Sequence, residues 1–181
     1  EYIRRQYPGF KLISSTTKRI TGLDGLLEEL NKDYFLVVLD YDLNHNEEVL
    51  SAIGKQADKV EILVNEICYP GCPKRSEHYR QQSQMQLEYD IDAAFPCPNK
   101  TRERKFEECK ERPSFISREQ IREYADRGFV NFKIVGRGMP MDFVKESYLY
   151  YLVKDDSKAF IRNKMESTLN QFAQAMRKRK A

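Results

Sequence analysis

The sequence predicts an α/β fold of parallel β/α units, either the C-terminal portion of a TIM-type (β/α) barrel or an incomplete barrel. Short apolar segments alternate along the chain with segments of helical periodicity, which is typical of a parallel sheet with right-handed crossovers. The first three apolar segments begin at residues 11, 34 and 60, the spacing of a repeating β/α unit. The chain of 181 residues is shorter than the roughly 200 that an eight-stranded barrel needs.

We expect one β/α domain over residues 1–181, with a cysteine-bearing insertion at about 67–113 and C-terminal helices at 141–181. The chain begins with Glu1 rather than methionine. The early strands of a barrel are therefore expected to lie outside it.

Five segments are predicted as strands. Residues 34–40 are apolar except for the last, Asp40, and residues 60–65 are rich in β-branched side chains. Residues 11–17 end in four consecutive hydroxyl residues. The other two predicted strands are residues 114–116 and 129–135.

Helices are expected between and after these strands. Ser117 and Gln120 have the spacing of a capping box, in which side chains and backbone cap the first turn reciprocally. Thr21 and Asp24 have the same spacing ahead of a leucine-rich stripe. One helix therefore begins near Thr21, and the others cover residues 46–56, 74–86, 117–126, 141–153 and 157–177.

The composition is that of a soluble globular protein, with 40% hydrophobic and 33% charged residues. No apolar run approaches the roughly 20 residues that span a bilayer, and no signal peptide opens the chain, so we expect a cytoplasmic protein without membrane contacts. The net charge of +3 does not by itself indicate a nucleic-acid-binding protein. The basic clusters at 100–105 and 177–180 are interpreted as solvated surface, or the first of them as part of an RNA contact.

The stretch from Val60 to Arg80 leads from a buried strand into a cysteine loop and then into a basic helix. Cys68 and Cys72 follow the end of the strand, where α/β folds gather ligands and catalytic groups. Four cysteines without a secretory signal favour reduced thiols or metal ligation over a disulfide framework.

The candidate ligands of a metal site are the four cysteines, Cys68, Cys72, Cys97 and Cys109. Successive cysteines are separated by three, 24 and 11 residues, and the wide second pair fits a zinc ribbon poorly. Proline follows Cys72 and Cys97, and a Cys-Pro step also occurs in ferredoxin-type cluster motifs. Three alternatives stay open: an iron–sulfur cluster, a zinc ion, and cysteines that are unligated or paired in disulfides.

Four further side chains are candidates for catalysis: Asp40, His78, Lys133 and Arg137. Asp40 follows a strand and is interpreted as a base or ligand, or as a cap of the next helix. His78 is interpreted as a proton carrier that faces the cysteines, or as a residue that caps or pairs with a neighbour. Lys133 and Arg137 lie on or just beyond the last strand, where they suit an anionic substrate.

Two segments resemble one known family. Residues 65–79 (NEICYPGCPKRSEHY) resemble the strand-to-cysteine segment of the collagenase-like peptidase family, the U-thirty-two group. Residues 132–137 (FKIVGR) resemble the FKIxGR element of a late strand in that family. The two elements stand in the family's order, and the resemblance covers roughly residues 11–150.

The resemblance implies a TIM-like barrel and, for several members, a 4Fe–4S cluster with Cys68, Cys72, Cys97 and Cys109 as its ligands. It also implies oxygen-independent hydroxylation of RNA bases or of a quinone precursor, despite the peptidase name. The late-strand basic positions of the family fall on Lys133 and Arg137. The Cys68–Cys72 spacing is tighter than in those members, and the chain lacks the Ser/His/Asp or Cys/His pattern of a peptidase.

Three functions follow from these observations. The first is an iron–sulfur enzyme that modifies RNA or a small molecule. The second is a non-catalytic module that zinc or a cluster stabilises, and the third is RNA binding by the basic and aromatic residues of 74–89 and 100–105. A partner chain or a preceding segment is expected to complete the barrel, because an open sheet edge promotes aggregation.

Overall fold

A parallel sheet of four strands forms the centre of the protein, whose computed structural model describes residues 2–89, 95–97 and 104–178. The strands lie side by side in the order in which they follow along the chain. They are β1 (Ile13–Ser14), β2 (Leu36–Val38), β3 (Val60–Leu63) and β4 (Asn131–Lys133). The α/β class and the parallel direction of the strands are therefore confirmed.

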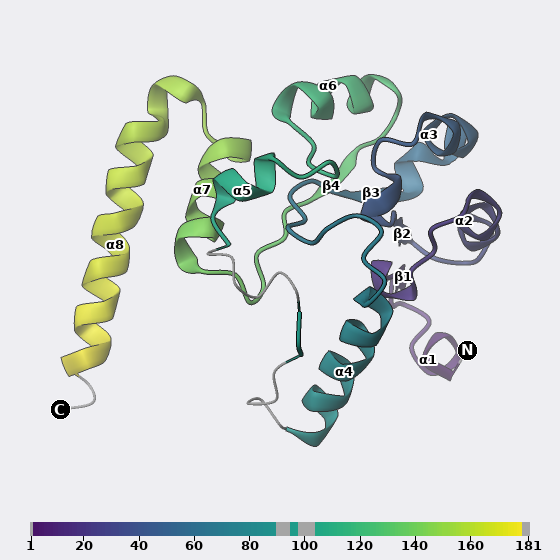
Figure 1. The fold of residues 1–181 in the computed structure, drawn as a ribbon, viewed down its shortest axis with the longest axis horizontal. Coiled ribbons are helices and arrows are strands. Elements are labelled where there is room, and N and C mark those ends of the chain that lie inside the picture. The colour runs from purple at the N-terminus through teal and green to yellow at the C-terminus, as the bar shows by residue number, and fades with distance from the viewer. Residues whose placement is uncertain (1, 90–94, 98–103, 179–181) are drawn as a thin grey trace.

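Helices cover one face of the sheet (Figure 1). They are α2 (Leu23–Leu30), α3 (Glu47–Ile53) and α6 (Arg118–Asp126). Their apolar side chains form one core with alternate residues of the strands, since successive side chains of a strand point to opposite faces. The core includes Val37, Val60 and Ile62 of the strands, and Leu39 and Val64 directly after β2 and β3.

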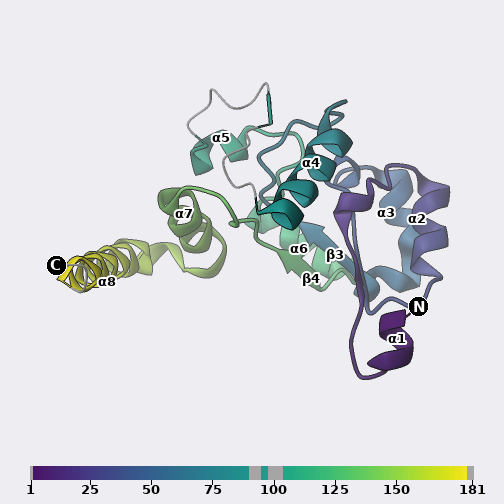
Figure 2. The ribbon, with the colours of Figure 1, turned by 90° about the horizontal axis from the view of Figure 1, so that it is seen from below.

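The remaining helices lie around the sheet edges and the cysteine segment (Figures 1 and 2). The short α1 (Tyr2–Gln6) precedes β1, and α4 (Arg75–Glu88) follows the cysteine loop. The last three, α5 (Phe106–Lys110), α7 (Met141–Leu152) and α8 (Lys158–Lys178), lie beyond β4. There α7 packs against both α5 and α8, and α8 lies farthest from the sheet.

Four short segments of 3₁₀ helix connect these elements in the described part of the chain. They are η1 (Thr16–Lys18), η2 (Tyr41–Leu43), η3 (Gly54–Lys59) and η4 (Asp155–Ser157). Three of them adjoin the ends of strands, so the strands are shorter than the apolar segments that predicted them.

Two strand predictions need correction. Residues 114–116 are not a strand, because the chain turns at Ser114 and the Ile116 amide bonds to Val64 O, just beyond β3, at 3.0 Å. The first strand ends at Ser14 instead of continuing to residue 17. Beyond it, the Ser15 side chain accepts a hydrogen bond from the Thr17 amide at 3.2 Å, and such a bond competes with sheet pairing.

One of the two predicted capping boxes is correct. Ser117 and Gln120 bond reciprocally to each other's backbone amides at the start of α6, at 2.8 and 3.2 Å. The capping box at Thr21 is wrong, because α2 begins at Leu23 and its cap is Gly22, which has no side chain. Asp24 instead lies in the first turn, where a carboxylate favours the positive end of the helix.

The sheet face opposite α2, α3 and α6 is only partly exposed and carries charge: Val38 and Leu63 are buried on it, whereas Lys133 is exposed. Lys133 on β4 forms an ion pair with Glu61 on β3, with a distance of 3.0 Å between Nζ and Oε2. Ile13 on β1 shares this face with Leu36 and is half exposed. Across the described ranges, no helix is both long enough and apolar enough to cross a bilayer.

Candidate functional site

Asn65, directly after β3, joins the carboxyl ends of two strands. Its Oδ1 accepts from the Val135 amide at 2.6 Å, and its Nδ2 donates to Val135 O at 3.0 Å. The same nitrogen donates to Ser147 Oγ of α7 at 3.1 Å. Asn65 is fully buried, so these bonds satisfy an amide that has no access to water. The cysteine loop therefore begins from a point anchored to both β4 and α7.

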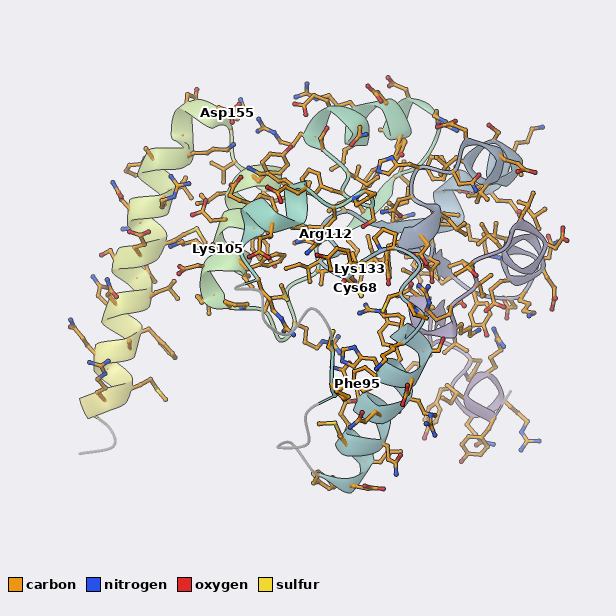
Figure 3. The ribbon with its side chains drawn as sticks, in the orientation of Figure 1. Cys68, Phe95, Lys105, Arg112, Lys133 and Asp155 are labelled. Carbon is orange, nitrogen blue, oxygen red and sulfur yellow. The ribbon has the colours of Figure 1, made fainter. Side chains whose placement is uncertain are left out.

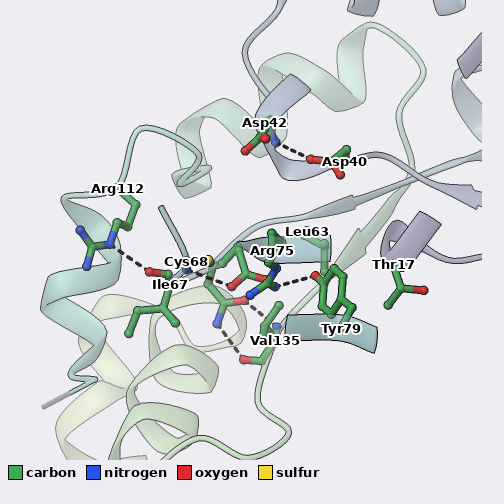
Figure 4. Close-up of polar contacts among 12 residues, drawn as sticks. Thr17, Asp40, Asp42, Leu63, Ile67, Cys68, Arg75, Tyr79, Arg112 and Val135 are labelled. Atoms are coloured by element: carbon green, nitrogen blue, oxygen red, sulfur yellow. Dashed lines mark hydrogen bonds and ion pairs between the residues drawn. The ribbon is translucent and has the colours of Figure 1, made fainter. Parts of the chain in front are cut away.

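Glu66 holds the first turn of the cysteine loop through Cys68 and Arg75, both of which are labelled in Figure 4. Its Oε1 accepts from the Cys68 amide at 3.0 Å, and its Oε2 pairs with Arg75 Nη2 at 3.2 Å. The Arg75 guanidinium donates to Tyr79 Oη at 2.6 Å and lies over the Tyr79 ring, 4.3 Å from its centroid. The paired side chains of Glu66 and Arg75 are only 8% and 12% exposed, so water screens their attraction little.

A cavity of about 60 Å³ lies beside this ion pair, and we call it the cysteine cavity. It is lined by Ile67, Cys68, Arg75, His78, Cys97, Arg104, Glu108 and Arg112. Figure 3 shows Cys68 and Arg112 near one another at the centre of the molecule. Two buried atoms of its lining residues, Arg75 Nε and Glu108 Oε2, have no hydrogen-bond partner among the described residues. Because such atoms are costly when left unpaired, they indicate a place for a further polar or charged group.

The other two cysteines lie close to the residues of this cavity. The buried Cys109 thiol lies 3.7 Å from Glu66 O, and burial raises the pKa of Cys109 to about 12. Burial also raises the pKa of Cys68, and the proximity of Cys72 adds to the rise. All four cysteines are free thiols. Within the described ranges, however, no three His, Cys, Asp or Glu side chains form a group that could hold a metal ion.

His78 faces the cysteine cavity from α4, as the proton-carrier interpretation requires. Its ring stacks on Phe95, with 4.6 Å between the ring centroids and an interplanar angle of 6°. Burial lowers the pKa of His78, and the nearby charges of Arg75 and Arg104 lower it further. These effects favour the neutral imidazole over the imidazolium. Its part in catalysis stays a prediction.

Asp40 has a structural role at the end of β2. The Arg19 guanidinium donates to both Asp40 carboxylate oxygens at 2.7 Å and to Asp42 Oδ2 at 2.6 Å. Asp40 also caps η2, since its Oδ1 accepts from the Asp42 amide at 3.1 Å. Burial raises the pKa of Asp40, and the charge of Arg19 opposes that rise. The capping interpretation is confirmed for this 3₁₀ turn, and a role as base or ligand stays a prediction.

The two basic residues of the last strand region occupy different places. Lys133 lies on the open face of the sheet and is paired with Glu61. Arg137 is exposed, lies beyond β4, and lines a wide cleft beside α4. The structure therefore does not bring the two together, and a shared role in holding substrate stays a prediction.

Three side chains of this region have no local signal in the sequence. Arg19 reaches Asp40 from a left-handed backbone conformation with φ of 56°. Arg112 donates from Nε to Ile67 O at 3.0 Å, and its guanidinium lies 3.9 Å from the Tyr69 ring centroid. Glu108 reaches the cysteine cavity from α5. The groups that these side chains approach are distant in the sequence, so only the tertiary structure identifies the three residues.

Comparison with known proteins gives one relative. Over 150 residues the chain is 28% identical to a protein of Methanocaldococcus jannaschii that is called an uncharacterized protease. The match covers 80% of this chain and 44% of that protein, so the chain spans less than half the length of the relative. No protein-family model matches the chain, and no solved structure matches it. The relative is consistent with the resemblance to the collagenase-like peptidase family.

Proposed function

We propose that the chain is the cluster-bearing part of an iron–sulfur protein, with Cys68, Cys72, Cys97 and Cys109 as ligands of a 4Fe–4S cluster. The observation that carries the proposal is the cysteine cavity, where Cys68 and Cys97 meet two buried polar atoms without partners. Four free thiols are the donor set that such clusters use. The thiols are not grouped in the described structure. Binding of a cluster therefore requires the four cysteine side chains to move closer to one another around this cavity.

The reaction we propose is an oxygen-independent hydroxylation of an RNA base or a small molecule, as the family resemblance implies. When bound, the cluster would supply electron transfer or a Lewis-acid site. Glu66 positions Cys68 through its backbone amide, and Arg75 places positive charge next to thiolate ligands. His78 lines the same cavity, and its role there is to accept a proton.

Metal and sulfide analysis of protein purified without oxygen tests this proposal. We expect about four irons and four sulfides per chain, with broad visible absorbance that dithionite bleaches. Cys68→Ser and Cys97→Ser should each lose the cluster, whereas Ala125→Ser, on the exposed side of α6, should keep it. Iron content that is unchanged in both cysteine variants would contradict the ligand assignment.

A structural zinc module is the alternative for the same cysteines. Zinc would tie the segment that follows α4 to the cysteine loop, and a bound metal can order a segment with a small apolar core. A colourless protein with one zinc per chain, lost in the same two variants, would favour this function over the redox one. A metal-free protein with four reactive thiols would contradict both.

A cysteine peptidase is a second candidate, because the archaeal relative is called a protease and Cys68 and His78 line one cavity. A nucleophilic cysteine needs a lowered pKa, whereas burial raises the pKa of Cys68. Hydrolysis of casein that is lost in both Cys68→Ser and His78→Ala, with no iron in the active protein, would establish this candidate instead.

We also propose that the sheet is part of a TIM-type barrel that another segment or chain completes. Its strands are parallel and sequential, its helices cover one face, and its open face carries the Glu61–Lys133 pair. The chain alone is therefore expected to associate through its free edges, which light scattering would detect. A strictly monomeric chain that leaves the dye ANS unbound would contradict this proposal.

A further inference from the structure

A second and larger cleft lies at the carboxyl edge of the sheet. Its volume is about 820 Å³, and it lies between α4, the turn after β1 and the loop after β4. Thr17 comes from the first of these loops, Gly138 from the second, and Tyr79 from α4. Figure 4 shows Thr17 beside Tyr79. The cleft is therefore in the position where α/β folds bind their ligands and is of ligand size.

The described lining of the cleft carries positive charge and no carboxylate that would balance it. Arg80 and Arg137 both line it and are exposed, and within the described residues neither has a hydrogen bond or an ion pair. No Asp or Glu is among its described lining residues. Most other charged side chains around the sheet are paired, as in the contacts of Arg19 with Asp40 and of Arg75 with Glu66. A concave site with charge of one sign attracts ligands of the opposite sign.

The neutral groups of the cleft can orient such a ligand. Thr17, Ser76 and Ser83 supply hydroxyl groups, and Gln82 and Gln86 supply amides that both donate and accept. Side chains of this kind bind the oxygens of a sugar or the polar edge of a ring. The guanidinium groups of two arginines match the two charges of one phosphate monoester, which arginine binds through paired hydrogen bonds.

We propose that this cleft binds a small phosphate monoester, with Arg80 and Arg137 on its phosphate group. Tyr79 connects the cleft to the cysteine cavity, because it lines the cleft while its hydroxyl accepts from Arg75. The phosphate site stands on the charge and shape of the cleft alone. It therefore does not depend on the cluster.

Calorimetric titration with adenosine monophosphate, and with adenosine as the uncharged comparison, tests the site. We expect binding of the monophosphate but not of adenosine, and weaker binding as the salt concentration rises. Arg80→Gln and Arg137→Gln should each weaken binding about tenfold, since each removes a charged hydrogen-bond donor. Arg122→Gln, an equal change on the exposed side of α6, should leave the affinity unchanged.

Three results would overturn the proposal. The first is equal affinity for the monophosphate and for adenosine. The second is an equal loss of monophosphate affinity in Arg80→Gln, Arg137→Gln and the control Arg122→Gln. The third is binding of an adenosine oligoribonucleotide without binding of the monophosphate, which would assign the cleft to a nucleic acid strand. Cys68→Ser should bind the monophosphate normally, so failure of the cluster proposal and failure of this one are distinguishable.

Discussion

The two faces of the sheet are built from the same four strands but differ in what covers them. On the helix-covered face, Val37, Val60 and Ile62 are at most 1% exposed and pack against α2, α3 and α6. On the other face, Lys133 of the Glu61–Lys133 pair is half exposed, and the Glu66–Arg75 pair lies near the carboxyl end. One face is held by apolar burial alone, whereas the other combines buried Val38 and Leu63 with charge pairs.

The difference shows how stability and function are divided in this protein. Apolar burial is non-directional and supplies most of the folding free energy. Charge pairs contribute little net stability, but each one places a particular group at a particular point. The cysteine cavity lies beside the Glu66–Arg75 pair, and the cleft along α4 lies at the same carboxyl end of the sheet. Variants on the two faces should therefore fail in different ways.

The largest effect is expected on the helix-covered face. Ile62→Ala should lower the free energy of unfolding by about 4 kcal/mol, because it leaves a cavity in a closely packed core. Ile13→Ala deletes the same atoms at a side chain that is 49% exposed and should cost less than about 1 kcal/mol. Urea unfolding of both variants measures the comparison. Similar losses of unfolding free energy in Ile62→Ala and Ile13→Ala would show that the face carrying Ile13 is covered in solution.

The next largest effect on stability is expected at the buried Glu66–Arg75 ion pair, which adjoins the cysteine loop. Glu66→Gln should lower the free energy of unfolding by about 2 to 3 kcal/mol, because Arg75 loses its counter-charge. It should also speed alkylation of Cys68 by iodoacetamide, since the Glu66 charge helps to raise the pKa of the Cys68 thiol and the variant removes that charge. Glu107→Gln, at the exposed pair with Lys110, is the matched control and should change neither quantity. An unchanged alkylation rate in Glu66→Gln would remove Glu66 from the site.

A pH-dependent effect is expected at Glu29, which ties α2 to the turn after β1. Burial opposes its ionisation, but hydrogen bonds from Lys18, Ser14 and Lys32 lower the pKa of Glu29 to about 2. A carboxylate with a depressed pKa stabilises the fold above about pH 4.5 and loses that contribution as the pH falls toward 2. Glu29→Gln should therefore lower stability by about 1 to 2 kcal/mol at pH 7. The difference in unfolding free energy between Glu29→Gln and the unchanged protein should shrink between pH 4.5 and 2. A difference that stays constant over this range would refute the lowered pKa of Glu29.

The smallest effect is expected on the open face. Lys133→Met breaks an ion pair in which the lysine side chain is 48% exposed, and should change stability by less than about 1 kcal/mol. Glu61→Gln should change stability by a similarly small amount. The effect of the double variant should be close to the sum of the two single effects. A loss above 2 kcal/mol would mean that the pair is buried, as it would be inside a closed barrel.

The local patterns of the chain were enough to predict several elements. The apolar runs that contain β2 and β3, and the capping box of α6, depend on residues that are close in sequence. The strand proposed at residues 114–116 failed, because a brief apolar segment does not show whether a sheet partner is available. The cysteines were singled out by their residue type, but spacing alone could not show that Cys68 and Cys97 line one cavity.

By itself the sequence determined the α/β class, the parallel strands and the segment that carries the cysteines, because periodicity and residue type are local properties. Only the tertiary structure decided the partners of the charged residues. It paired Lys133 with Glu61, Asp40 with Arg19 and Arg75 with Glu66, and it left Arg137 unpaired among the described residues. The physical reason is that a charge is satisfied by whichever group the fold brings within a few ångströms, and that group is usually distant in the sequence.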